Sequence, residues 1–255
     1  MQRMARNGEA SIAYTAEGDG PPLVIIASTG RGTAEFGDLA DRLAGHGFRV
    51  LRPEPRGIGA STGAMAGVSF HGFAADIAAV LRAEGGRPAI LAGHAYGNWI
   101  ARTVAADFPA LARGVVLMAA GAKSMPRALI DTITMINDPA SREADRLAGL
   151  RRAFFAAGND PRPWLDGWHP EVTRSQRAAR ALTEGDWLAA GTVPVLDLQA
   201  AADPFRPPDT RDELRAEFGD RLQIRLIDGA SHALPAERPR EVADAIAEWA
   251  SRLPE

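Results

Sequence analysis

The chain has 255 residues, of which 46% are hydrophobic, so it is long enough to form one large α/β domain with a substantial core. Its formal net charge of −3 argues against nucleic acid as a partner, and the absence of cysteine excludes disulfides and thiolate chemistry. The start of the chain is polar and no stretch approaches the roughly 18 apolar residues of a membrane span, so we expect a cytoplasmic monomer or homodimer without a membrane partner.

Strand and helix patterns alternate through the first half of the chain. Residues 10–16 alternate like a half-buried strand, and short apolar runs predict buried strands at 23–27, 48–52, 88–92 and 114–119. Helical spacing of apolar residues predicts helices at 35–46, 70–84 and 98–107. This alternation indicates βαβ units and therefore an α/β fold with a mostly parallel central sheet flanked by helices.

The pattern changes in the second half. Residues 121–191 contain helical patches and several tryptophans but no convincing strand. Strand patterns return at 193–198 and 222–227, and an amphipathic helix is expected at 241–252. We therefore predict that residues 1–120 and 192–255 form the core and that residues 121–191 form a helical cap inserted into it.

The segment Gly93-His94-Ala95-Tyr96-Gly97 lies where a predicted strand runs directly into a predicted helix. That is the context of the Gly-x-Ser-x-Gly nucleophile elbow, in which small flanking residues let strand and helix approach each other. In such a turn, the backbone N–H of Tyr96 would face the reacting centre at the N-terminus of the helix. The alternative is an ordinary glycine-bounded turn without chemistry.

An acid and a histidine follow the elbow in the order that a catalytic triad on this scaffold requires. Asp203 follows the strand at 193–198, and His232 follows the strand at 222–227. With these motifs the chain resembles the α/β-hydrolase superfamily, in its branch with a helical cap, but with an atypical elbow. The resemblance implies the α/β-hydrolase fold, and it assigns the nucleophile position to Ala95, the orienting acid to Asp203 and the general base to His232.

Alternatives to these two assignments remain open at this point. Asp203 could be a turn residue before Pro204, and Asp197 and Asp209 are competing acids. His232 could be a solvated loop histidine.

The loop after the strand at 23–27 aligns with the family's oxyanion-hole loop. The family often has His-Gly there, whereas this chain has Ser28-Thr29. By position, the N–H of Thr29 would pair with that of Tyr96 to hold an oxyanion. The hydroxyl of Ser28 and the cation of Arg31 would either contact substrate or only shape the loop.

The predicted substrate pocket is mainly apolar and suits a small or medium apolar molecule. We expect substrate contacts from residues beside the elbow and from cap aromatics, namely Ser28, Arg31, His94, Phe155, Trp164 and Trp168. The chain shows neither metal-ligand spacing nor a phosphate-binding loop, so we expect no metal and no organic cofactor.

Alanine at position 95 leaves three hypotheses, because a methyl group has neither the proton nor the lone pair of a nucleophile. In the first, the enzyme acts on a carbonyl or ester-like substrate without a covalent bond, through His232, Asp203 and the oxyanion hole. The reaction would then be hydrolysis, elimination, isomerisation or cyclisation. In the second, the chain is an inactive Ser→Ala variant of a serine esterase, lactonase or carbon–carbon hydrolase. In the third, it is a non-catalytic protein that binds a small molecule.

Overall fold

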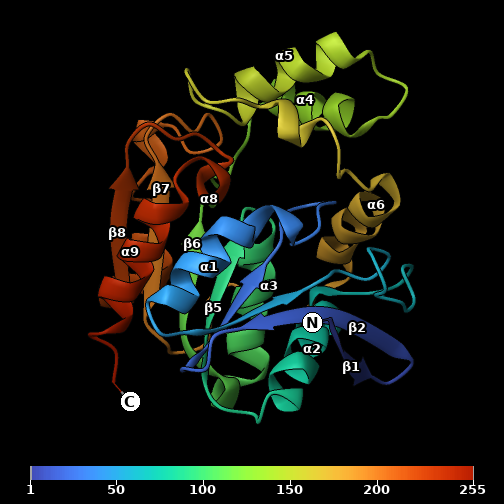
Figure 1. Cartoon of the computed structure of the whole chain (residues 1–255). Helices are drawn as coiled ribbons and strands as arrows, with labels where there is room; N and C mark the ends of the chain where they lie inside the picture. Colours follow the sequence, from blue (N-terminus) through green and yellow to red (C-terminus); the bar gives the residue numbers. More distant parts are fainter. Residues whose placement is uncertain (1, 255) are drawn as a thin grey trace.

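The computed structural model describes residues 2–254, which form one eight-stranded sheet with helices on both faces (Figure 1). The strand order is β1-β2-β4-β3-β5-β6-β7-β8. The strands are β1 (Arg3–Asn7), β2 (Ala10–Glu17), β3 (Pro22–Ile26), β4 (Arg49–Pro53), β5 (Ala89–His94), β6 (Ala112–Met118), β7 (Val195–Ala200) and β8 (Leu222–Ile227).

Strands β3 to β8 run parallel to one another, whereas β2 runs antiparallel to both of its neighbours, β1 and β4. The carboxyl ends of the parallel strands therefore lie along one edge of the sheet. The loops that follow β3, β5, β7 and β8 open at that edge, which is where ligands bind in open α/β sheets.

The flanking helices divide between the two faces of the sheet. Helices α2 (Phe70–Ala83) and α3 (Gly97–Asp107) contribute to the apolar core on one face. Helices α1 (Gly37–Gly45) and α9 (Pro239–Ala250) contribute to the core on the other face. The short helices α7 (Arg215–Phe218) and α8 (Leu234–Glu237) lie in the loops around β8.

The segment between β6 and β7 is helical and stands over the carboxyl edge of the sheet (Figure 1). It contains α4 (Arg127–Asn137), α5 (Glu143–Ala153) and α6 (Pro170–Ala179). A separate apolar cluster holds α4, α5 and the aromatic residues that follow them together. The division of the chain into core and cap at residues 120 and 192 stays a prediction.

The predicted α/β class with a mostly parallel sheet is confirmed, and seven of the eight strands lie within about two residues of their expected places. Strand β1 was missed. It is an edge strand with the sequence Arg-Met-Ala-Arg-Asn, in which only Ala5 is buried, so it shows no apolar pattern. None of the helices within residues 2–254 is long and apolar enough to cross a bilayer.

The junction of β5 and α3 is sterically tight at both glycines of the elbow. A Cβ atom added at Gly93 would lie 2.3 Å from the carbonyl of Gly97, and one added at Gly97 would lie 2.4 Å from the carbonyl oxygen of Ile26. These contacts are with backbone, which cannot rotate away. Both positions therefore require glycine for close approach.

We expect Gly97→Ala to lower the free energy of unfolding by about 3 kcal/mol, because α3 must shift away from β3. Gly45→Ala is the matched control, since Gly45 also lies in a helix but has no atom within 4 Å of an added Cβ. Urea denaturation should show Gly45→Ala unchanged or slightly stabilised. Equal stability of the two variants would contradict the close packing at the elbow.

Candidate active site

Ala95 occupies the sharp turn between β5 and α3 with a φ of +47°, in the left-handed region that non-glycine residues rarely adopt. Its N–H donates to the carbonyl oxygen of Met118 at the end of β6, at 2.9 Å. Backbone strain of this kind is concentrated at functional sites. The turn thus has the backbone conformation of a nucleophile elbow, with a methyl group at its apex.

The structure brings Asp203 and His232 together at the carboxyl edge of the sheet. Asp203 follows β7 and His232 follows β8, and the Nδ1 of His232 lies 2.9 Å from the Oδ2 of Asp203. The Oδ1 of Asp203 accepts the N–H of Phe205 at 2.8 Å, so both carboxylate oxygens have a partner. Both side chains are buried, His232 at 6% exposure and Asp203 at 4%.

This hydrogen bond settles the tautomer of the imidazole. A proton on Nδ1 is held by the Asp203 carboxylate, which leaves Nε2 of neutral His232 with a free lone pair. Within residues 2–254 no hydrogen bond uses that Nε2, and the His232 side chain lines a cavity. The pair therefore has the arrangement of a general base with its orienting acid.

The competing acids lie elsewhere. The Asp197 carboxylate accepts from Gln199 at 2.7 Å and lies 3.4 Å from Arg206, and burial raises its pKa to about 6. Asp209 is exposed on the loop before α7. Neither contacts His232, which leaves Asp203 as its acid.

His94 ties the elbow to the histidine loop. It is completely buried beside Ala95, and its Nε2 donates to the backbone carbonyl of His232 at 2.7 Å. Burial, together with the nearby His232, lowers the pKa of His94 to about 3, so its imidazole stays neutral. His94 therefore positions the base and carries no charge itself.

Two backbone N–H groups belong to residues that line the same cavity as His232. Neither the N–H of Thr29 nor that of Tyr96 has a hydrogen-bond partner in the part of the chain that the structure describes. Thr29 lies in the loop after β3, Tyr96 is the residue before α3, and both line the cavity that His232 lines. Unpaired N–H groups beside a base are the donors that an oxyanion hole needs.

The cavity has a volume of about 270 Å³ and is lined by residues of the elbow and of the helical segment between β6 and β7, among others. Most of its wall is apolar, and its polar groups come from a few side chains. It is lined by Ser28, Thr29, Ala95, Tyr96, Asn98, Trp99, Gly121, Ala122, Met125, Ile130, Ile133, Phe154, Trp168, Arg177, Arg180, Phe205 and His232.

Of the six residues predicted to contact substrate, Ser28 and Trp168 line the cavity. His94, Phe155 and Trp164 are not among the residues that line it, and their contact with substrate stays a prediction. His94 is turned into the protein by its bond to the histidine loop. Phe155 packs edge-on against Trp164 behind the cavity wall, while its neighbour Phe154 faces the cavity instead.

Arg31 also lies outside the cavity, because its guanidinium is used in joining core and cap. Its Nε is paired with Glu35 at 2.5 Å, and its Nη1 donates to the carbonyl of Asp166 at 3.0 Å. It lies between Trp164 and Trp168, 4.3 and 4.7 Å from their ring centres. Of the two roles considered for Arg31, these contacts favour the one in which it shapes the loop.

Sequence reasoning missed two cavity residues, Arg177 and Arg180, which lie at the end of α6. Their i, i+3 spacing places them on one face of the helix, but charged residues at such spacing usually mark a solvated face. The sequence gives no sign that this face looks into a cavity.

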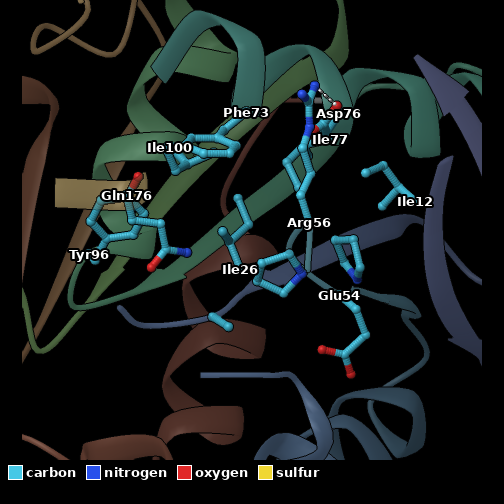
Figure 2. Close-up of a pocket in the computed structure, with 13 residues that line it drawn as sticks. Ile12, Ile26, Glu54, Arg56, Phe73, Asp76, Ile77, Tyr96, Ile100 and Gln176 are labelled. Atoms are coloured by element: carbon cyan, nitrogen blue, oxygen red, sulfur yellow. Dashed lines mark hydrogen bonds and ion pairs between the residues drawn. The ribbon is translucent and has the colours of Figure 1, made fainter. Parts of the chain in front are cut away.

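A second, smaller cavity of about 40 Å³ lies behind Tyr96 (Figure 2). Arg56 is paired there with Asp76 at 2.7 Å, and both side chains are buried. Glu54, on the same loop, accepts the N–H and the hydroxyl of Thr33 at 3.0 and 2.9 Å. These contacts fix the loops beside the elbow.

Within residues 2–254 no group of three or more His, Asp or Glu side chains is arranged to hold a metal ion. The polar groups in the main cavity are a base, backbone donors, hydroxyls, an amide and two guanidinium groups. This set can activate water and stabilise an oxyanion.

Comparison with known proteins identifies the family. A family model described as the alpha/beta hydrolase family matches residues 23–245. Pyrrolizixenacetamide deacetylase of Xenorhabdus hominickii is 32% identical over 44% of this chain and 42% of its own length. Rhodomycin D methylesterase DnrP of Streptomyces peucetius is 25% identical over 96% of both chains. The solved structure of Rv0554 from Mycobacterium tuberculosis superposes with a TM-score of 0.81, at 22% identity over 100% of both chains.

Within residues 2–254, the fold places a hydrogen-bonded Asp–His pair and two unpaired backbone N–H groups beside one cavity. The chain belongs to the alpha/beta hydrolase family, a family of enzymes, because the family model covers most of its length. It spans about half the length of several of the curated relatives that it matches.

We expect His94 to make the protein less stable in acid. In the unfolded chain, the solvated side chain of His94 takes up its proton near the ordinary histidine pKa of about 6.5. In the folded protein, burial lowers the pKa of His94 to about 3. Between these values only the unfolded chain binds the proton, so this group lowers the free energy of unfolding by about 1.4 kcal/mol per pH unit as the pH falls.

The matched variant is His94→Gln, whose amide N–H can still reach the carbonyl of His232 but does not titrate. Urea denaturation as a function of pH should show the unmodified chain losing about 2 kcal/mol relative to the variant between pH 6.5 and pH 5. Parallel stability profiles would contradict the neutral, buried state of His94.

Proposed function

We propose that this protein hydrolyses a small or medium ester- or amide-like substrate by general-base catalysis, with water and not residue 95 as the nucleophile. The observation that carries the proposal is the His232–Asp203 hydrogen bond of 2.9 Å, beside a cavity that Ala95 also lines. The names of the relatives, a methylesterase and a deacetylase, favour hydrolysis over elimination, isomerisation or cyclisation.

In the proposed first step, Nε2 of His232 removes a proton from water as the water oxygen attacks the carbonyl carbon of the substrate. The electrons of the C=O double bond move to its oxygen, and the resulting anion accepts hydrogen bonds from the N–H groups of Thr29 and Tyr96. Asp203 stabilises the imidazolium that forms.

In the second step, the oxyanion re-forms the C=O bond and the bond to the leaving alcohol or amine breaks. The imidazolium of His232 gives its proton to that leaving group, so the base returns to its neutral form. Alanine differs from serine by one oxygen atom, and a water above the Ala95 methyl would occupy the space of that oxygen. The catalytic geometry is therefore that of a serine hydrolase with the nucleophile replaced by solvent.

A role in binding alone accounts for less of the site. A protein that only binds a ligand does not need a buried carboxylate hydrogen-bonded to an imidazole, and this chain holds such a pair beside the cavity. A serine-type activity would require a different residue at position 95, and the strained φ of +47° at that residue is compatible with serine.

We expect slow hydrolysis of p-nitrophenyl acetate or p-nitrophenyl butyrate by the unmodified chain, with kcat/KM falling about 10²- to 10⁴-fold in His232→Gln. Asp203→Asn should fall similarly, because the imidazole loses its orienting acid. His46→Gln controls for surface imidazole catalysis, since His46 is half-exposed and paired with Asp244. If His232→Gln and His46→Gln have the same small effect, the proposed base is wrong.

A second experiment tests the geometry without knowledge of the substrate. Ala95→Ser should react with a fluorophosphonate probe, because Nε2 of His232 is placed to activate a hydroxyl at position 95. The double variant Ala95→Ser/His232→Gln should react at least about 10²-fold more slowly, and the unmodified chain should not react. A folded Ala95→Ser protein that stays unlabelled would contradict the arrangement of base and oxyanion donors.

A further inference from the structure

The cavity wall carries positive charge without any negative partner. Arg177 is at the end of α6 and Arg180 begins the turn that follows it. Both residues are exposed, and both line the cavity. Within residues 2–254 neither is ion-paired with an acidic side chain, and no Asp or Glu lines the cavity. This concentration of positive charge occurs in a protein whose formal net charge is −3.

The contacts of these two arginines leave their guanidinium groups available. Arg180 lies over the ring of Trp99, with its Cζ 4.9 Å from the ring centre, which leaves the N–H edge of the planar group free. Arg177 has only a long contact of 3.4 Å to the hydroxyl of Thr134. Partial burial lowers the pKa of Arg177, in keeping with a charge that no neighbouring acid compensates.

Helix α6 is fixed to the oxyanion loop, so the two arginines have a defined place relative to the catalytic donors. Gln176, next to Arg177, accepts the N–H of Gly30 at 2.7 Å. The N–H of His169, just before α6, donates to the carbonyl of Gly30 at 2.9 Å. These two bonds hold α6 beside the loop that contains Thr29.

The base lies on the other side of this edge of the sheet. His232 directly precedes α8, and α6 and α8 are well separated across the molecule (Figure 1). Both nevertheless contribute to one cavity. A substrate that reaches from one to the other presents two different ends.

We propose that the substrate carries a carboxylate, which Arg177 and Arg180 bind while its ester or amide carbonyl lies at His232. This inference rests on the proposed function, and it names the substrate class as an acyl compound with an anionic end. Paired guanidinium groups recognise carboxylates by charge-assisted, often bidentate hydrogen bonds. The small or medium apolar substrate expected from the sequence would then carry one charged end.

Binding can be measured separately from turnover by using His232→Gln as the background, so that the probe stays intact. The probes are monomethyl glutarate, which has one carboxylate, and dimethyl glutarate, which has none. We expect isothermal titration calorimetry to show about tenfold or tighter binding of the monoester. Added Arg177→Gln and Arg180→Gln substitutions should abolish this preference.

Two further variants serve as controls. Arg174→Gln removes a charge from the same helix, but Arg174 is exposed, paired with Glu171 and outside the cavity, so the preference should be unchanged. Arg177→Lys with Arg180→Lys keeps both charges but not the planar donors, and it should keep only part of the preference. Equal binding of the two probes, no binding of the monoester, or an unchanged preference in the Arg177→Gln/Arg180→Gln variant would overturn the proposal.

Failure of this inference is distinguishable from failure of the proposed function. A preserved carboxylate preference in a protein whose turnover does not depend on His232 would leave the anion site standing and remove the hydrolase mechanism. Turnover that depends on His232 but is equal for neutral and anionic esters would support the hydrolase mechanism and remove the anion site.

Discussion

The close approach of β5 to α3 at Gly93 and Gly97 is the constraint on which the site depends. An added Cβ at either glycine would collide with backbone at 2.3 or 2.4 Å, so only this pair lets the chain turn so sharply. The turn holds Ala95 in a left-handed conformation, and Ala95 and Tyr96 both line the cavity. Because His94 also bonds to the backbone of His232, the same turn fixes the position of the base.

The chemistry that we propose without a serine depends on the hydrogen-bonded pair of Asp203 and His232. A buried carboxylate is costly unless its oxygens are hydrogen-bonded, and Asp203 satisfies this with His232 and the N–H of Phe205. The aromatic ring of Phe205 also lies against the imidazole, with ring centres 4.2 Å apart, and limits its rotation. We therefore regard His232 as a preorganised base whose proton donor is solvent.

Much of the architecture could be predicted from the sequence, because apolar runs and helical spacing report burial directly. The positions of Ala95, Asp203 and His232 could be predicted because each follows a recognisable strand, and the acid and base meet as expected. The lining of the cavity could not be predicted from these local patterns. Arg31 looked like a ligand from its place in the loop, but its contacts with Glu35 and the cap tryptophans are made through tertiary structure. Arg177 is exposed, as its spacing suggests, but the spacing does not show that the end of α6 also lines the cavity.

In the proposed mechanism, catalysis proceeds without a covalent bond to the protein. This can be tested by intact-protein mass spectrometry on samples quenched during the turnover of p-nitrophenyl acetate, together with the early time course of p-nitrophenol release. A non-covalent mechanism predicts an unchanged protein mass and a linear release without a burst. A transient acetyl adduct on Ser28 or any other residue, formed and lost at the rate of turnover, would contradict it.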